Sequence, residues 1–349
     1  MISFMNDYSE GAHPRIMEAL NRTNLEQTVG YGKDEYCAEA ADLIRKRIGR
    51  PDAAVHFMVG GTPANVTVIA AALRPYQGAI AASTGHIAGH ESGAVEGTGH
   101  KILTIPAENG KINAEQIERL IRAHYDNETH EHEVQPGIVY LSQPTELGTL
   151  YSKEELTAIS KVCHKFHIPL YVDGARLAAA LASEQNDVTI EDLARLADVF
   201  YIGGTKMGCL IGEALVINDP RIDDDFRYMI KRQCGMLAKG RLLGVQFAEL
   251  FRDGLYEEIG RDTMAQAVRL REGLKALGCE FLVDSPTNQL FPIFTDDQIA
   301  TLREKYQFEL WGRVDLTHTA VRFVTSWATK SENVDALLKD VEAVLKENK

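Results

Sequence analysis

Apolar and polar positions alternate in blocks along the first two thirds of the chain. Seven short apolar runs are separated by longer segments with helical periodicity, and several runs are apolar at nearly every position, as strands buried on both faces are. The runs are Ala53–Gly61, Ala79–Thr84, Ile102–Pro106, Gly137–Gln143, Ile168–Asp173, Val199–Gly203 and Ala214–Asn218. This alternation predicts an α/β fold with a mostly parallel seven-stranded sheet flanked by helices.

Three of the intervening helices begin with a capping box, in which a Ser, Thr or Asn precedes an acid or amide by three residues. The predicted helices are Ala114–Tyr125 after Asn113, Glu154–Phe166 after Ser152, and Ile190–Leu196 after Thr189. Thr62 is expected to cap a further helix, with Pro63 as its first residue.

The pattern changes after about residue 220. Two long helices are predicted there, followed by short strands and a C-terminal amphipathic helix. They are Asp223–Phe251, Arg261–Leu277, Phe281–Val283, Gln289–Phe294, Phe308–Trp311, Ala320–Thr325 and Ser331–Lys346. We therefore expect an N-terminal arm and large domain over residues 1–245, and a smaller α+β C-terminal domain over residues 246–349.

Composition and charge narrow the class of protein. The 349 residues are 45% hydrophobic and 25% charged, as in an ordinary globular protein. The net charge of −13 disfavours a nucleic-acid partner, and no apolar run reaches the roughly 18–20 residues of a membrane helix. The N-terminus lacks the pattern of a secretory signal, and the five cysteines form no C-x-x-C pair. We expect a cytoplasmic protein with reduced thiols and no metal site.

Three segments carry candidate chemistry, and the first is the turn Val59–Asn65 between a strand and a helix. Gly60 and Gly61 allow main-chain N–H groups to approach a ligand closely, and a helix start of this kind binds an anion, most naturally a phosphate. A tight turn that binds nothing would use the same residues, so this segment alone does not establish a phosphate site.

The other two segments end apolar strands. Asp173 is the last residue of one strand, at the edge of the sheet where ligands bind in open parallel sheets. A plain salt bridge to Arg176 would be an alternative reason for a carboxylate at this position. Lys206 follows another strand among Gly203, Gly204 and Gly208. Small neighbours leave room there for a planar ligand, and desolvation lowers the pKa of a lysine toward a nucleophilic amine.

Together the three segments match the needs of pyridoxal 5′-phosphate (PLP). Its phosphate binds at a helix N-terminus, its ring nitrogen pairs with a carboxylate, and its aldehyde reacts with a lysine. The sequence resembles the low-specificity threonine aldolases of the β-eliminating lyase family of fold-type I PLP enzymes, over nearly its whole length. The motifs are Gly30-Tyr31-Gly32-Lys33-Asp34, Gly61-Thr62, His86-Ile87, Glu91-Ser92-Gly93-Ala94, Asp173-Gly174-Ala175-Arg176, Lys206 and Val321-Arg322-Phe323-Val324-Thr325.

The resemblance assigns cofactor roles to five residues. Lys206 holds PLP covalently, Asp173 pairs with the pyridine nitrogen, and His86 stacks on the ring. Gly61 and Thr62 bind the phosphate. Lys206, His86 and Asp173 are the expected catalytic residues.

The resemblance also implies how substrate and neighbouring subunits are bound. Arg322 binds the substrate carboxylate, and Arg176 reaches either this carboxylate or the O3′ side of the cofactor. Lys239 and Arg241 resemble a basic stretch that reaches a phosphate from a neighbouring subunit, and Tyr31 lies in a segment that contributes across the dimer. A homodimer or homotetramer with shared active sites is therefore expected.

Some positions depart from the family pattern. Asn6 stands where the family has a serine that contacts substrate, and Thr145 and Glu146 stand near the place of a histidine held beside the substrate hydroxyl. His90, one turn after His86, is expected to line the substrate pocket.

The expected reaction is retro-aldol cleavage of a β-hydroxy-α-amino acid, of the threonine or allo-threonine type, to glycine and an aldehyde. His86, His90 or an ordered water is the base. The alternatives on the same scaffold are a PLP-dependent β-eliminating lyase and an aminotransferase. An alternative from another class is a non-catalytic α/β protein that binds a ligand or nucleotide.

Overall fold

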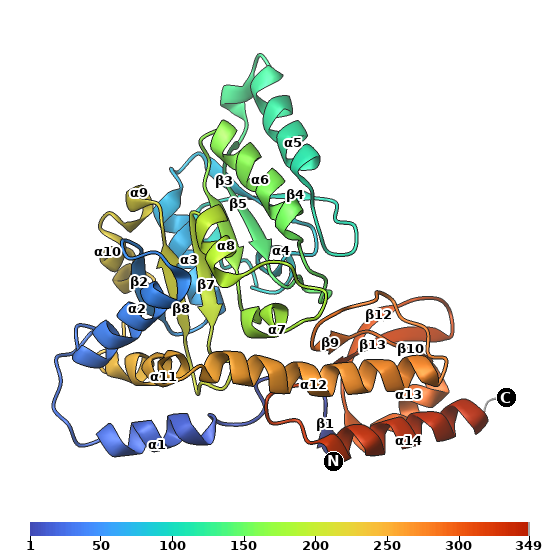
Figure 1. The fold of residues 1–349 in the computed structure, drawn as a ribbon. Helices are drawn as coiled ribbons and strands as arrows, with labels where there is room; N and C mark the ends of the chain where they lie inside the picture. The colour runs from blue at the N-terminus through green and yellow to red at the C-terminus, as the bar shows by residue number, and fades with distance from the viewer. Residues whose placement is uncertain (348–349) are drawn as a thin grey trace.

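The large sheet lies at the centre of the N-terminal part of the chain, in a computed structural model that describes residues 1–347 (Figure 1). Its strands are β2 (Ala54–Met58), β3 (Gln77–Ala82), β4 (Ile102–Ile105), β5 (Gln135–Ser142), β6 (Leu170–Asp173), β7 (Val199–Gly203) and β8 (Glu213–Ile217). The order is β2-β8-β7-β6-β5-β3-β4, and β8 alone runs antiparallel to its neighbours. The predicted mostly parallel sheet of seven strands is confirmed.

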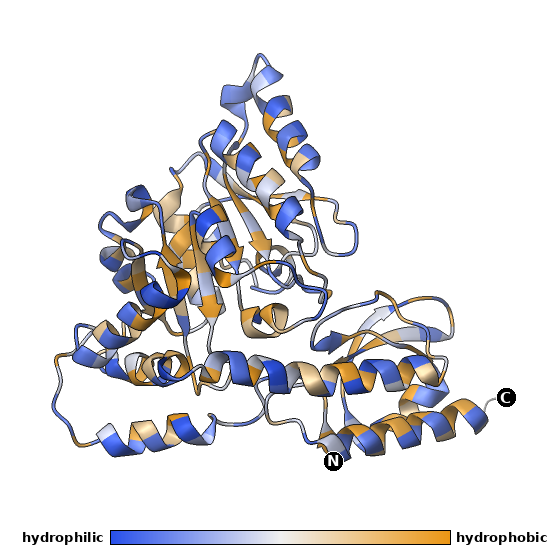
Figure 2. Ribbon diagram, viewed as in Figure 1, coloured by the Kyte–Doolittle hydropathy of each residue, from blue (hydrophilic) through white to orange (hydrophobic). Residues whose placement is uncertain are grey.

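Helices cover both faces of this sheet, so its strands are apolar on both sides. In β7, Phe200 and Ile202 belong to one hydrophobic core, and Val199 and Tyr201 belong to the core on the opposite face. Figure 2 shows the strands as largely hydrophobic and the outer helices as mixed. The first core contains residues of α1 (Pro14–Thr23), α2 (Glu35–Ile48), α5 (Ala114–Asp126), α6 (Lys153–Lys165), α7 (Leu177–Leu181), α8 (Ile190–Leu196) and α11 (Arg241–Arg252); the second contains residues of α3 (Gly61–Ala72), α4 (His86–Gly89), α9 (Pro220–Asp223) and α10 (Phe226–Arg232).

A smaller sheet and its helices form the C-terminal unit, and the long helix α12 (Leu255–Ala276) runs from the large sheet to it (Figure 1). The strands are β9 (Gln289–Leu290), β10 (Ile293–Thr295), β12 (Glu309–Arg313) and β13 (His318–Val324), and the helices are α13 (Asp296–Arg303) and α14 (Ser331–Glu347). β13 is central, because β9, β10 and β12 all pair antiparallel with it.

The start of the chain packs with this C-terminal unit. β1 (Ile2–Ser3) pairs in parallel with β11 (Tyr306–Gln307), and Phe4 joins the hydrophobic core of the unit. The N-terminal segment therefore spans both units before α1 begins. The domain division after residue 245 stays a prediction. No helix within residues 1–347 is long and apolar enough to cross a membrane.

Several element predictions were wrong in detail. The single helix predicted over Asp223–Phe251 is broken into separate helices, because Asp225 and Cys234 adopt left-handed φ values of 55° and 62°. The helix predicted from Arg261 already begins at Leu255. Phe281–Val283 forms only an isolated bridge, from Phe281 to Pro292. α3 begins at Gly61 with Gly60 as its N-cap, so Thr62 lies inside the helix and does not cap it.

Candidate active site

The carboxyl ends of five parallel strands meet at one edge of the large sheet, and the candidate site lies there. β6 ends at Asp173, β7 leads into Lys206, and β2 leads into the turn at Gly60. β3 leads into His86, and β5 leads into Glu146. Ligands of open α/β sheets bind at such an edge.

Asp173 is a buried carboxylate whose partners are hydrogen-bond donors. The Tyr140 hydroxyl donates to Asp173 Oδ2 at 2.6 Å, the Asn65 amide donates to the same oxygen at 3.3 Å, and the main-chain N–H of Ala175 donates to Oδ1 at 3.0 Å. No salt bridge to Arg176 is present, so the alternative explanation of Asp173 as an Arg176 salt bridge is wrong. Three neutral donors stabilise the ionised carboxylate without neutralising its charge.

Lys206 lies in a tight turn after β7 and is partly buried. Its Nζ atom has no hydrogen bond or salt bridge to any residue within 1–347. Burial lowers the pKa of Lys206 below its ordinary value, and the positive charge of Arg176 lowers it further. The turn requires glycine, because a Cβ atom on Gly203 would lie 2.2 Å from the carbonyl oxygen of Ala175. An unpartnered amine with a lowered pKa is suited to attack an aldehyde.

The glycine turn faces the same cavity as Asp173 and Lys206. Gly60, Gly61 and Thr62 line this cavity, which has a volume of about 360 Å³. A Cβ atom on Gly61 would lie 2.9 Å from the Tyr201 hydroxyl, so glycine keeps the start of α3 open. We call this space the inner cavity.

His86 lies between the inner cavity and Glu91, at the first turn after β3. Its Nδ1–H donates to Glu91 Oε1 at 2.7 Å, and the Asn65 amide donates to the same oxygen at 2.7 Å. Burial alone would lower the pKa of His86, but the Glu91 hydrogen bond and the nearby Asp173 charge raise it above the ordinary value. Asn65 therefore links the His86–Glu91 pair to Asp173.

A second cavity of about 420 Å³ adjoins the first, and we call it the outer cavity. The C-terminal unit supplies one of its walls. Its lining includes the predicted substrate residues Asn6, His90, Arg176 and Arg322, together with Met5, Tyr8, His86, Glu146, Lys206, Gln289, Glu309 and Trp311. The sequence predictions thus come together in two adjoining spaces.

The two arginines of the outer cavity each have a carboxylate partner. Arg176 donates to both oxygens of the buried Asp7, at 2.6 and 3.1 Å. Arg322 forms a salt bridge with Glu309 and donates from Nη1 to Gln289 at 3.1 Å, while its buried Nε has no partner. Arg322 therefore has an ion-pair partner within its own chain, although it also lines the outer cavity.

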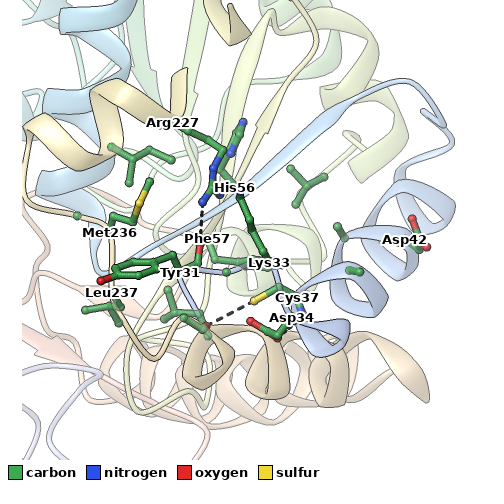
Figure 3. A pocket seen from close by; sticks show the side chains of 18 of the residues that line it. Tyr31, Lys33, Asp34, Cys37, Asp42, His56, Phe57, Arg227, Met236 and Leu237 are labelled. Carbon is green, nitrogen blue, oxygen red and sulfur yellow. Dashed lines mark hydrogen bonds between the residues drawn. The ribbon is translucent and has the colours of Figure 1, made fainter. Parts of the chain in front are cut away.

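Tyr31, Lys239 and Arg241 lie outside both cavities. Arg241 donates at 2.7 Å to the main-chain carbonyl groups of Thr23, the last residue of α1, and of Glu26. Lys239 is exposed and forms no salt bridge within the described chain. Figure 3 shows Tyr31 in a separate cavity of about 300 Å³.

Sequence patterns did not indicate several polar residues of the site. In the sequence, Tyr140 looks like a further apolar position of its strand, yet its hydroxyl donates a hydrogen bond to Asp173. Asp7 lies far from Arg176 in the sequence, and it fixes the Arg176 side chain. Glu213 lies in an apolar run at the inner cavity, where it accepts from the N–H of Gly204 at 2.9 Å. Burial raises the pKa of Glu213 to about 7. For Tyr140 and Glu213, the available signal of a site residue was a hydroxyl or charged group inside an otherwise apolar run.

The fold and the site define a class of protein, namely an α/β enzyme in which an unpartnered lysine, a buried aspartate and a glycine turn line one cavity. The family model of the beta-eliminating lyases matches residues 4–297, and the chain belongs to this family. The match confirms the predicted family and, with it, a PLP-dependent lyase of fold-type I.

Known relatives cover the whole chain. A low specificity L-threonine aldolase from a Pseudomonas species is 30% identical over 98% of this chain and 97% of its own. A structure of Leishmania major threonine aldolase has a TM-score of 0.96 and 42% identity, over 99% of this chain and 100% of its own. Thermus thermophilus aspartate aminotransferase, with a TM-score of 0.73 and 15% identity over 99% of this chain and 91% of its own, shows the same fold.

Proposed function

We propose that this chain cleaves β-hydroxy-α-amino acids of the threonine or allo-threonine type to glycine and an aldehyde. The observation that carries the proposal is the unpartnered Lys206 in one cavity with Asp173, beside a second cavity that contains Arg322. The two threonine aldolases that match over nearly their full length support the same substrate class.

The residues of the inner cavity fit PLP. Lys206 would hold the aldehyde carbon, and Asp173 would keep a proton on the pyridine nitrogen. Gly61 and Thr62 would meet the phosphate at the open start of α3, and the His86 ring would cover the pyridine ring. When bound, PLP supplies an aldehyde that reacts with amines and a protonated ring that accepts electrons.

The chain's own residues then orient the substrate and move its protons. Arg322 would bind the substrate carboxylate, in exchange for part of its contact with Glu309. Arg176, fixed by Asp7 through Nε and Nη2, lines both cavities and would contribute a second positive charge beside the substrate. A substrate held at its carboxylate and at its amine has one orientation, and such orientation supplies a large part of the rate acceleration in enzymes.

Product analysis tests the proposed reaction. Incubation with threonine and with allo-threonine is expected to yield glycine and acetaldehyde. A keto acid with ammonia would instead indicate β-elimination, and an amino-group transfer to an added keto acid would indicate an aminotransferase. Borohydride reduction followed by peptide mapping is expected to label Lys206, and a label on another lysine would contradict the cofactor assignment.

We also propose a cytoplasmic homodimer or homotetramer in which Tyr31 and Lys239 complete a neighbouring site. Both residues are exposed, and neither lines the inner or the outer cavity of its own chain, which supports this role. Both Nη groups of Arg241 already donate to main-chain carbonyl groups of Thr23 and Glu26, so Lys239 is the better candidate for a phosphate contact. All five cysteines are free, which is compatible with a reducing compartment.

A further inference from the structure

Glu146 stands at the boundary between the inner and outer cavities. Five side chains line both spaces: Tyr8, His86, Glu146, Arg176 and Lys206. Among residues 1–347, Glu146 is the one carboxyl group that does so. The amine of a bound substrate must reach Lys206, while the side chain of the substrate occupies the outer cavity. The β-carbon of the substrate therefore lies at this boundary.

One oxygen of Glu146 is fixed and the other is available. The main-chain N–H of His86 donates to Oε1 at 2.8 Å, and the Ser142 hydroxyl donates to Oε1 at 2.6 Å. No side chain within residues 1–347 donates to Oε2, and no cation of these residues forms a salt bridge with this carboxyl group. The fixed oxygen orients the side chain, which lines both cavities.

The loop that carries Glu146 is rigid on both sides. The Gln143 side chain exchanges two hydrogen bonds with the main chain of Tyr151, at 2.9 and 3.0 Å. The main-chain N–H of Thr145 donates to the carbonyl of Thr149 at 2.9 Å, and the N–H of Gly148 donates to the carbonyl of Thr145 at 2.8 Å. A side chain on such a loop keeps one position relative to Lys206.

The other boundary side chains are less suited to accept a proton. Arg176 is a permanent cation paired with Asp7, and Lys206 is required for the cofactor. His86 is bonded through Nδ1 to Glu91, and under the proposed function its ring covers the pyridine ring of the cofactor. Tyr8 is 52% exposed, and no described residue orients its hydroxyl.

We propose that Glu146 is the catalytic base for the β-hydroxyl group of the substrate, an inference that rests on the proposed aldolase function. Its Oε2 accepts the hydroxyl proton while the Cα–Cβ bond breaks. The electron pair of the O–H bond becomes the second bond of the aldehyde carbonyl. The electron pair of the Cα–Cβ bond leaves with the glycine carbon, which then takes up a proton from water, and Glu146 returns its own proton to water.

The surroundings of Glu146 favour proton exchange. Burial raises the pKa of Glu146 above its ordinary value, the Ser142 hydrogen bond opposes this, and the negative charge of Asp173 adds to it. The charge of His86 acts in the opposite direction. A carboxylate with a raised pKa is a stronger base and takes up a proton more readily.

The Glu146→Gln variant tests the proposal, because the amide keeps the shape and can still accept at the Oε1 position. Its kcat for threonine is expected to fall by roughly 10²–10⁴-fold. The cofactor absorbance band should be unchanged, and the exchange of glycine α-protons with D₂O, followed by NMR, should persist. Glycine has no β-hydroxyl group, so this exchange does not need the base. Glu146→Asp should restore part of the cleavage.

Two further measurements separate Glu146 from a structural role. The acidic limb of the kcat–pH profile should disappear in Glu146→Gln. Infrared difference spectra of the cofactor-free protein between acidic and neutral pH should lose one carboxyl signal, a result that does not depend on turnover.

The contrary outcomes distinguish a wrong role for Glu146 from a wrong proposed function. If the wild-type protein cleaves threonine and Glu146→Gln cleaves it equally fast, the proposal is overturned. It is also overturned if α-proton exchange disappears together with cleavage, or if His90→Asn and not Glu146→Gln removes the acidic limb. A wild-type protein that cleaves no β-hydroxy amino acid would overturn the proposed function itself, and this role with it.

Discussion

Asp173 illustrates how single residues set the chemistry of this site. Its three hydrogen-bond donors come from β5, α3 and the turn after β6, so three separate segments fix one carboxylate. Because none of the donors is charged, the negative charge remains available to a cationic ring nitrogen. An aspartate in a salt bridge would already be paired with a positive charge, so it would stabilise a cationic ring nitrogen much less.

Asp173→Asn should therefore bind PLP but lose turnover. The amide cannot keep a proton on the pyridine nitrogen, and we expect kcat to fall at least tenfold, about 1.4 kcal/mol of transition-state stabilisation. Absorbance of the bound cofactor and single-turnover rates would measure both effects. Tyr140→Phe, which removes one donor and keeps the charge, is the matched comparison and should lose less. Near-normal turnover of the Asn variant would contradict the role.

Arg322→Lys tests the substrate contact. Lysine keeps the positive charge but loses the two-pronged geometry of the guanidinium group, so kcat/KM for threonine should fall about tenfold or more while the cofactor spectrum stays unchanged. Arg313→Lys, on the same small sheet but outside both cavities, is the control and should retain normal kinetics. If Arg322 only pairs with Glu309, the two variants will behave alike.

At the scale of elements, regular periodicity predicted most of what is seen. The capping boxes at Asn113, Ser152 and Thr189 place the starts of α5, α6 and α8 correctly. The segment between α9 and α11 was mispredicted because its interruptions come from left-handed backbone at Asp225 and Cys234, which leave no period in the sequence.

The candidate site was likewise predictable only in part from the sequence. Lys206 and Asp173 were predictable because strand ends share one edge of a parallel sheet. The partners of Arg176 and Arg322 were not, because Asp7 and Glu309 are 169 and 13 positions away in the sequence, and Asp7 reaches Arg176 only through the folded chain. Long-range pairs of this kind depend on tertiary packing.

Gly203→Ala should weaken the junction between β7 and the turn after β6. The added Cβ atom would overlap the main chain of Ala175, which cannot rotate away, and overpacking of this kind costs typically 1–3 kcal/mol. Thermal unfolding should show a lower Tm for the variant. Gly97→Ala, where nothing lies within 4 Å of the added atom, should leave Tm nearly unchanged. Equal Tm values for both variants would contradict the close packing.

At the scale of the whole molecule, Asp7 joins the two units. It accepts from Arg176 of the large unit and, at 2.9 Å, from Asn288 of the C-terminal unit. Burial alone would raise the pKa of Asp7, but the charges of Arg176 and Lys206 and the hydrogen bonds lower it below its ordinary value. Its contribution to stability is therefore fully present above the unfolded pKa and is lost as the pH falls through the folded pKa.

Asp7→Asn should lower the Tm at neutral pH, because it leaves the Arg176 cation buried without a counter-charge, a change that typically costs about 3–5 kcal/mol. The difference in Tm from wild type should stay constant above the ordinary aspartate pKa and shrink as the pH falls below it. Tm measured across acidic and neutral pH checks this. A difference that does not change with pH would contradict the linkage.

Subunit mixing tests the shared active site. Lys206→Ala and Lys239→Ala should each be nearly inactive alone, and their mixture after subunit exchange should recover roughly a quarter of wild-type activity in a two-fold symmetric dimer. Half of the dimers would then be mixed, and each would contain one complete site. Light scattering should show at least a dimer, whereas a fully active monomer, or no recovery on mixing, would contradict the arrangement.

Different parts of the chain build the two adjoining cavities, and this separation decides which substitutions can alter the substrate range. Loops at the edge of the large sheet build the inner cavity, whereas Gln289, Glu309 and Trp311 of the C-terminal unit close the outer one. Substitutions on β9 and β12 can therefore reshape the space for the substrate's side chain without touching the residues around Asp173. Substrate range and cofactor chemistry become separately adjustable traits, and directed evolution of new β-hydroxy amino acid substrates should begin at Trp311.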